Sequence, residues 1–189
     1  MHNVECPECG RLHDIEALEP SFRRPDEFLE LVERDEVEYQ DGKDACAVRA
    51  TDLSWERYFI RVLIPFTILS LDEPISWGAW VEVTSGQFDR VGELWDDPNQ
   101  SSEPPFQARL ANDIVAYDDS MSITGSVSLT DPSNIPTFHM TAPADHPFVV
   151  EQRSAITPAR AADWLVFVYH PEALIQRRID KLLSARGDG

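Results

Sequence analysis

Apolar residues are most concentrated between Phe59 and Thr84, where they alternate with other residues at the period of a β-strand. Turn-forming residues at 72–74 separate two such runs, so the pattern predicts an antiparallel hairpin. Trp77 and Trp80 fall on opposite faces of the second strand. We therefore expect both faces of the hairpin to be covered and the rest of the sheet to be built around it.

Helical spacing recurs in four other segments. Pro25 to Glu36 has a proline and two acids in its first turn, which favours a short helix there. Ser85 is expected to cap a helix that ends near Asp96. Thr157 and Pro158 are expected to open a helix that runs to Tyr169, where His170 and Pro171 break it. An amphipathic helix is predicted from Glu172 to about Ala185.

The remaining segments alternate like strands or are rich in turn residues. Residues 45–49 predict a short strand before the hairpin, and 97–105 predict a loop. The alternation of Met121–Thr130 is typical of a half-exposed strand, with 136–142 as its antiparallel neighbour and 148–150 as another extended segment. The predicted fold class is α+β: a mainly antiparallel sheet with helices packed on one face and an N-terminal cysteine knuckle. We expect one globular domain over residues 1–171, followed by a C-terminal amphipathic helix and tail over 172–189.

The charge balance bears on the binding partners. The chain has 189 residues, with 34 acidic and 16 basic side chains and a formal net charge of -18. Such a field repels phosphate backbones and anionic lipid, so we expect neither nucleic-acid nor membrane binding. It fits either a solvated surface or an acidic face that docks a basic protein partner. The absence of an apolar leader or spanning segment and the odd count of three cysteines favour a cytoplasmic protein with reduced thiols.

The strongest chemical signal is the sequence Cys6-Pro-Glu-Cys9-Gly10. Two cysteines at this spacing form half of a zinc site, and a glycine after the second one fits a tight knuckle. His13 or Cys46 could complete a tetrahedral, structural Cys3His set. A redox-active thiol pair and ordinary reduced cysteines are the alternatives that the pattern leaves open.

A second candidate site surrounds Asp145, His146 and Arg153, with His139 on the strand before them. A histidine beside a carboxylate can act as a general base, and an arginine can hold an anionic substrate. The alternative is structural, because a histidine before a proline often only completes a turn. The sequence contains neither the G-x-S-x-G motif of nucleophilic serines nor the H-E-x-x-H motif of zinc proteases, and it has no glycine-rich phosphate-binding loop.

An ordered set of short motifs runs along the chain: Cys6-x-x-Cys9-Gly10-x-x-His13, Asp44-x-Cys46, Phe59-Ile60-Arg61, Ile64-Pro65, Trp77-Gly78-x-Trp80-Val81, and His146-Pro147 with Gln152-Arg153 and Ile156-Thr157. This set resembles one bacterial family, domain of unknown function 2199, over about residues 4–171. The resemblance implies a small cytoplasmic bacterial protein whose family has no established activity. It also strengthens the association of Cys46 with the two N-terminal cysteines.

Two hypotheses for function follow. The favoured one is a non-enzymatic protein-interaction module, with or without a stabilising zinc ion, that uses its acidic surface or its C-terminal helix. The alternative is a small hydrolase-like or metal-assisted enzyme that uses Asp145, His146 and Arg153. Convergence of these three side chains in one cleft would favour the enzyme.

Overall fold

The computed structural model describes residues 2–69, 71–173, 175 and 176, and it confirms the α+β class. Seven strands form one sheet in the order β3-β4-β5-β6-β7-β8-β9, in which all neighbouring strands are antiparallel. A separate pair, β1 and β2, forms a small N-terminal hairpin. The strands are β1 Asn3–Glu5, β2 Leu12–Asp14, β3 Val37–Asp41, β4 Ala45–Ala50, β5 Glu56–Phe66, β6 Ile75–Val83, β7 Phe106–Leu110, β8 Thr124–Ser128 and β9 Thr137–Ala142.

The predicted central hairpin is confirmed as β5 and β6, which pair from Tyr58↔Val83 to Phe66↔Ile75. Both of its faces are covered, as the tryptophan pattern predicts. On one face Trp77 lies in the main hydrophobic cluster, whereas on the other Phe59 and Trp80 belong to a second cluster. Burial on both faces explains why this stretch is so apolar.

The strands β5 to β9 close on themselves, a feature that the sequence pattern does not predict. A parallel contact joins β5 to β9 at Leu63↔Thr137, and the Leu63 amide donates to the Pro136 carbonyl at 2.8 Å. Close approach between β8 and β9 requires a glycine at position 125. A Cβ atom there would lie only 2.4 Å from the His139 carbonyl oxygen.

Helices pack around the sheet, and those with described bounds are α1 Asp26–Val32, α2 Ser85–Leu94, α3 Pro147–Arg153 and α4 Pro158–Tyr169. Helix α1 covers the cluster of Phe59 and Trp80, while α4 buries Trp164 and Leu165 in the main cluster. Thr157 caps α4 by accepting from the Arg160 amide, as its sequence predicts. Thr84, one residue before the expected cap, forms a capping box with Gln87 at the start of α2.

One local prediction is wrong: residues 148–150 lie in helix α3 rather than in an extended segment. The His146 side chain caps this helix by accepting from the Phe148 amide, and Pro147 fits its first turn. Strand β3 is not anticipated, because its residues are mostly exposed and polar. The expected loop at 97–105 contains one short 3-10 turn at Gln100–Ser102. Most of the predicted C-terminal amphipathic helix lies outside the described residues.

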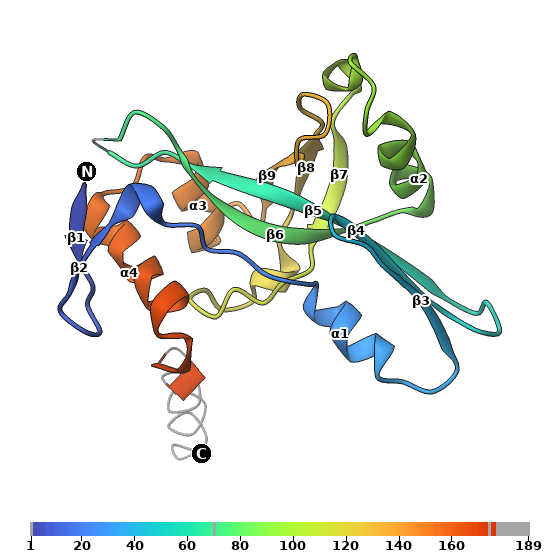
Figure 1. Cartoon of the computed structure of the whole chain (residues 1–189), viewed down its shortest axis with the longest axis horizontal. Helices are drawn as coiled ribbons and strands as arrows, with labels where there is room; N and C mark the ends of the chain where they lie inside the picture. The colour runs from blue at the N-terminus through green and yellow to red at the C-terminus, as the bar shows by residue number, and fades with distance from the viewer. Residues whose placement is uncertain (1, 70, 174, 177–189) are drawn as a thin grey trace.

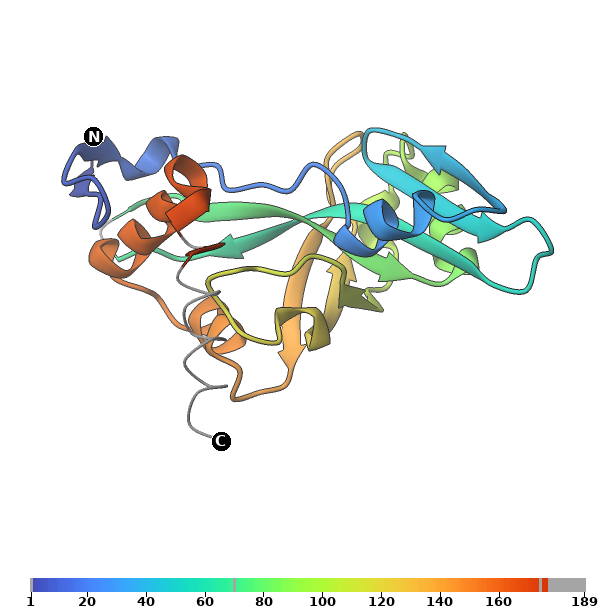
Figure 2. The ribbon, with the colours of Figure 1, turned by 90° about the horizontal axis from the view of Figure 1, so that it is seen from below.

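The elements that carry the three cysteines lie at two ends of the sheet. The β1-β2 hairpin sits beside α4 at one end, and β3, β4 and α1 extend to the other end in both views (Figures 1 and 2). Helix α4 contacts β1 directly. This arrangement decides which sequence-predicted ligands can meet.

Candidate metal centre

The turn of the N-terminal hairpin holds Cys6 and Cys9. The Cys6 amide donates to the Arg11 carbonyl at 2.8 Å, and the Gly10 amide donates to the Cys6 carbonyl at 2.9 Å. Gly10 has a φ of 67°, the left-handed conformation that glycine adopts at little cost. The knuckle expected from the Cys-x-x-Cys-Gly spacing is therefore present. Cys6 is fully buried and Cys9 is exposed.

The third member of the group is His170, the residue that ends helix α4. Its backbone amide still donates to Val166 at 2.8 Å, but its φ and ψ of -141° and 51° turn the chain out of the helix. One ligand atom each from Cys6, Cys9 and His170 lies within 4.8 Å of the others. These three residues could hold a metal ion.

The two ring nitrogens of His170 have different surroundings. Nε2 is buried and has no hydrogen-bond partner among the described residues, which is costly for a polar atom. Nδ1 lies 4.0 Å from Glu172 Oε1. A metal-ligating histidine usually donates its second ring N–H to an oxygen acceptor, and Glu172 lies near Nδ1 but beyond hydrogen-bond distance.

His13 lies next to this group without belonging to it. Its Nε2 is 3.9 Å from Cys9 Sγ, and its ring stacks on Tyr169 with the centroids 4.4 Å apart. Ligands of a tetrahedral zinc ion are separated by about 3.5 to 3.8 Å, as zinc bonds of about 2.0 to 2.3 Å require. The His13 nitrogen thus lies close to the Cys9 sulfur, one member of the group.

Cys46 does not meet the other cysteines. It lies on β4, pairs across the sheet with Phe59, and is fully buried in the second hydrophobic cluster. Burial raises the pKa of its thiol from the ordinary value of 9.0 to about 12. The expected association of Cys46 with the knuckle thus has no support in the geometry, because β4 lies at the other end of the sheet (Figure 1).

The second sequence-predicted site has its histidine in a structural role. His146 Nδ1 accepts from the Phe148 amide at 3.2 Å, and Nε2 lies 2.8 Å from the Asp118 carbonyl oxygen. Arg153 donates to the Thr141 carbonyl at 2.8 Å, and Asp145 is exposed. Both ring nitrogens of His146 are therefore occupied by backbone groups, which leaves neither free to act as a general base.

A buried polar network lies close by that the sequence does not indicate. The Tyr117 hydroxyl donates to Glu151 Oε2 at 2.5 Å and accepts from Trp164 Nε1 at 3.1 Å and from Arg160 Nη2 at 3.1 Å. Arg160 also bonds Glu151 directly at 2.7 Å. The pKa of Tyr117 is raised above its ordinary value, mainly by burial and secondly by the hydrogen bond to Glu151. These groups satisfy one another and join α3 to α4.

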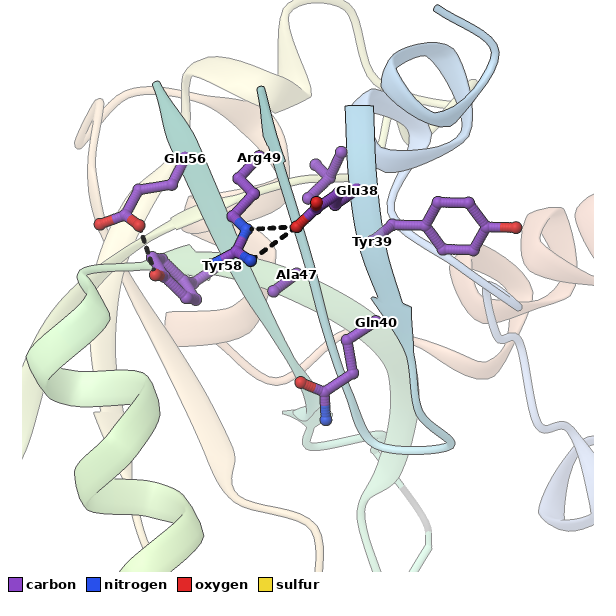
Figure 3. A pocket seen from close by; sticks show the side chains of 8 residues that line it. Glu38, Tyr39, Gln40, Ala47, Arg49, Glu56 and Tyr58 are labelled. Carbon is purple, nitrogen blue, oxygen red and sulfur yellow. Dashed lines mark hydrogen bonds and ion pairs between the residues drawn. The ribbon is translucent and has the colours of Figure 1, made fainter. Parts of the chain in front are cut away.

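A surface cavity of about 290 Å³ lies over β3, β4 and β5 (Figure 3). Arg49 bonds Glu38 at 2.6 Å there, and the Tyr58 hydroxyl donates to Glu56 at 2.7 Å. Tyr39 points away from the others in Figure 3. The charged groups drawn in this cavity are thus already paired with one another.

Comparison with known proteins places the chain in a family. The profile of domain of unknown function 2199, described as an uncharacterized protein conserved in bacteria, matches residues 5–156. The chain belongs to this family. No curated protein and no solved structure matches it. The family match includes Cys6, Cys9 and Cys46 but ends before His170. Within the described residues, none of the helices is both long and apolar enough to span a membrane.

Proposed function

We propose that this member of the family is a non-enzymatic binding module of the bacterial cytoplasm, stabilised by a zinc ion on Cys6, Cys9 and His170. The observation that carries the proposal is that His170 groups with two thiols, one ligand atom of each residue lying within 4.8 Å of the others. In addition, its buried Nε2 lacks a hydrogen-bond partner among the described residues. Zinc suits two soft sulfur ligands and an imidazole better than magnesium or calcium, which prefer oxygen.

The place of the ligands in the fold supports a structural role for this zinc. Cys6 and Cys9 belong to the N-terminal hairpin, whereas His170 ends α4. An ion bound to all three would fasten these two elements to each other. His13 as the fourth ligand would close the coordination shell, and a closed four-ligand shell is the mark of a structural zinc site.

A binding role is favoured over the hydrolase-like alternative for two reasons. Both ring nitrogens of His146 contact backbone groups, so neither is left to act as the general base that the alternative requires. The formal charge of -18 gives the surface a field that would attract a basic protein partner. Association with such a partner should weaken as salt increases, because exposed charges are screened.

Elemental mass spectrometry of tag-free protein tests the zinc site. We expect about one zinc per chain in the wild type. His170→Ala and Cys9→Ser should lose it, while Cys46→Ser is the matched control and should keep it. The absence of zinc from the wild type would contradict the proposal. Full retention by His170→Ala would contradict the assignment of the third ligand.

A further inference from the structure

Arg61 lines a cavity of about 370 Å³ that is separate from the metal centre. Residues from β5 and β6 and the segment 16–21 surround this cavity, and Arg61, Leu63, Ser76 and Gly78 are among them. Leu63 pairs with Gly78 across the two strands, so their positions fall on one sheet face. A cavity of this volume is large enough for a small organic molecule.

The guanidinium of Arg61 is poorly paired for a group whose side chain is only 27% exposed. Among the described residues, its one carboxylate contact runs from Nη1 to Asp44 Oδ1 at 3.5 Å. Its Nε is buried and has no hydrogen-bond partner among the described residues. By contrast, Arg49 and Arg160 each reach a carboxylate oxygen at 2.6 to 2.7 Å. The described part of the chain therefore supplies few hydrogen-bond acceptors for the guanidinium N–H groups of Arg61.

Gly78 keeps the space beside this guanidinium open. A Cβ atom at position 78 would lie 3.6 Å from Arg61 Nη2 and 3.0 Å from the Cβ of Ser21. The Gly78 amide donates to Pro20, and its carbonyl accepts from the Phe22 amide, both at 2.8 Å. The segment that forms the wall is thus held against β6 by backbone bonds, and the guanidinium lies beside a residue without a side chain.

We propose that this cavity binds a small α-amino acid with an apolar side chain, whose carboxylate pairs with Arg61. The planar guanidinium can donate two parallel hydrogen bonds to a carboxylate. Glu19, exposed on the same cavity, disfavours a ligand with net negative charge and favours one that also carries an ammonium group. Glu16 also lines the cavity, but its carboxylate already contacts His2 Nδ1 at 3.1 Å. Leu18, Leu63 and Ile75 supply apolar surface for the ligand's side chain.

This inference goes beyond the proposed zinc site and does not depend on it, because Arg61 is not a member of the candidate metal group. It gives the binding module a ligand class, which the family assignment does not supply. Zinc content measured on the same samples keeps the two proposals apart. We expect the Arg61 variants to leave zinc content at the wild-type level.

Isothermal titration of the full chain with L-leucine, L-methionine and L-phenylalanine tests the proposal. We expect at least one of them to bind, 4-methylpentanoate to bind more weakly, and isopentylamine and inorganic phosphate not to bind. Arg61→Gln should weaken binding about tenfold to a hundredfold, as the loss of a charge-assisted pair predicts. Arg49→Gln is the matched control, because Arg49 lies on the same sheet but outside this cavity.

Ser76→Leu provides a second variant, which fills the cavity and keeps Arg61 in place. It should also abolish binding, and circular dichroism would establish that each variant is folded. The proposal is overturned if none of the three amino acids binds the wild type. It is equally overturned if phosphate binds more tightly than the amino acids, or if folded Arg61→Gln and Ser76→Leu both bind like the wild type.

Discussion

Replacing Tyr117 with phenylalanine would test the buried network between α3 and α4 by removing a single oxygen. That hydroxyl donates to Glu151 and accepts from Trp164 Nε1 and Arg160 Nη2. Glu151 and Arg160 remain bonded to each other after the change, at 2.7 Å. Trp164 is fully buried, so its indole N–H would lose the one hydrogen-bond acceptor described for it.

The expected cost follows from these contacts. A hydrogen bond to a charged group contributes about 1.5 to 3 kcal/mol, and an unsatisfied buried donor costs about 1 to 3 kcal/mol. Because part of the first contribution is kept by the Glu151–Arg160 pair, we expect Tyr117→Phe to lower the free energy of unfolding by about 2 to 4 kcal/mol. Guanidinium unfolding followed by tryptophan fluorescence measures this change.

Tyr58→Phe is the matched control for that measurement. Tyr58 also donates to a glutamate, Glu56 at 2.7 Å, but this bond is exposed to solvent. Its loss should therefore cost about 0.5 kcal/mol or less. Equal costs for the two variants would refute the argument that burial makes the Tyr117 hydroxyl important. A cycle with Trp164→Phe should give less than additive losses, because the double variant leaves no indole N–H unpaired.

Three further predictions concern other parts of the fold. Because the Cys46 pKa is raised to about 12, its neutral thiol stabilises the folded state fully below pH 9.0, and this contribution, up to about 4 kcal/mol, is lost as the pH rises towards 12. The difference between the free energies of unfolding of the wild type and Cys46→Ala should therefore shrink as the pH rises from 9 towards 12. A difference that does not change with pH would contradict this reasoning. Gly125→Ala should lower the free energy of unfolding by at least about 2 kcal/mol, because its Cβ would meet a backbone oxygen. Gly92→Ala, in α2 with open space around it, should raise that free energy by about 1 kcal/mol, and a loss there would contradict the helix.

Sequence patterns predict those helices and strands that are specified by the residues within them and next to them. The alternation in β5 and β6 predicts a strand on each side of the turn, and Thr157 with Pro158 predicts the start of α4. Closure of β5 onto β9, which pair in parallel at Leu63↔Thr137, joins strands far apart in the sequence, and periodicity carries no information about such pairs. The helix at 147–153 is missed because its cap is a histidine rather than the serine, threonine, aspartate or asparagine that usually signals one.

The candidate metal group likewise contains residues that the sequence identifies and one that only the fold brings to the site. Spacing identifies Cys6 and Cys9, which are close in the chain and share one turn. His170 has no spacing relation to them, and in the sequence it signals only the end of α4 before a proline. Cys46 offers the residue type that zinc prefers, yet β4 carries it into a different hydrophobic cluster. Residue type therefore suggests Cys46 as the third ligand, whereas the topology brings His170 close to the two N-terminal cysteines.

The same topology determines what loss of the proposed zinc ion should do to the molecule. The main cluster contains Trp77, Phe148 and Trp164, none of which depends on the N-terminal hairpin for its packing against the others. The hairpin itself has only three residues in each strand, and a pair of strands that short is marginal by itself. Zinc loss in His170→Ala should therefore speed amide hydrogen exchange in residues 2–14 while exchange in β5 and β6 stays slow. Loss of protection throughout the chain would show instead that the zinc ion supports the whole fold.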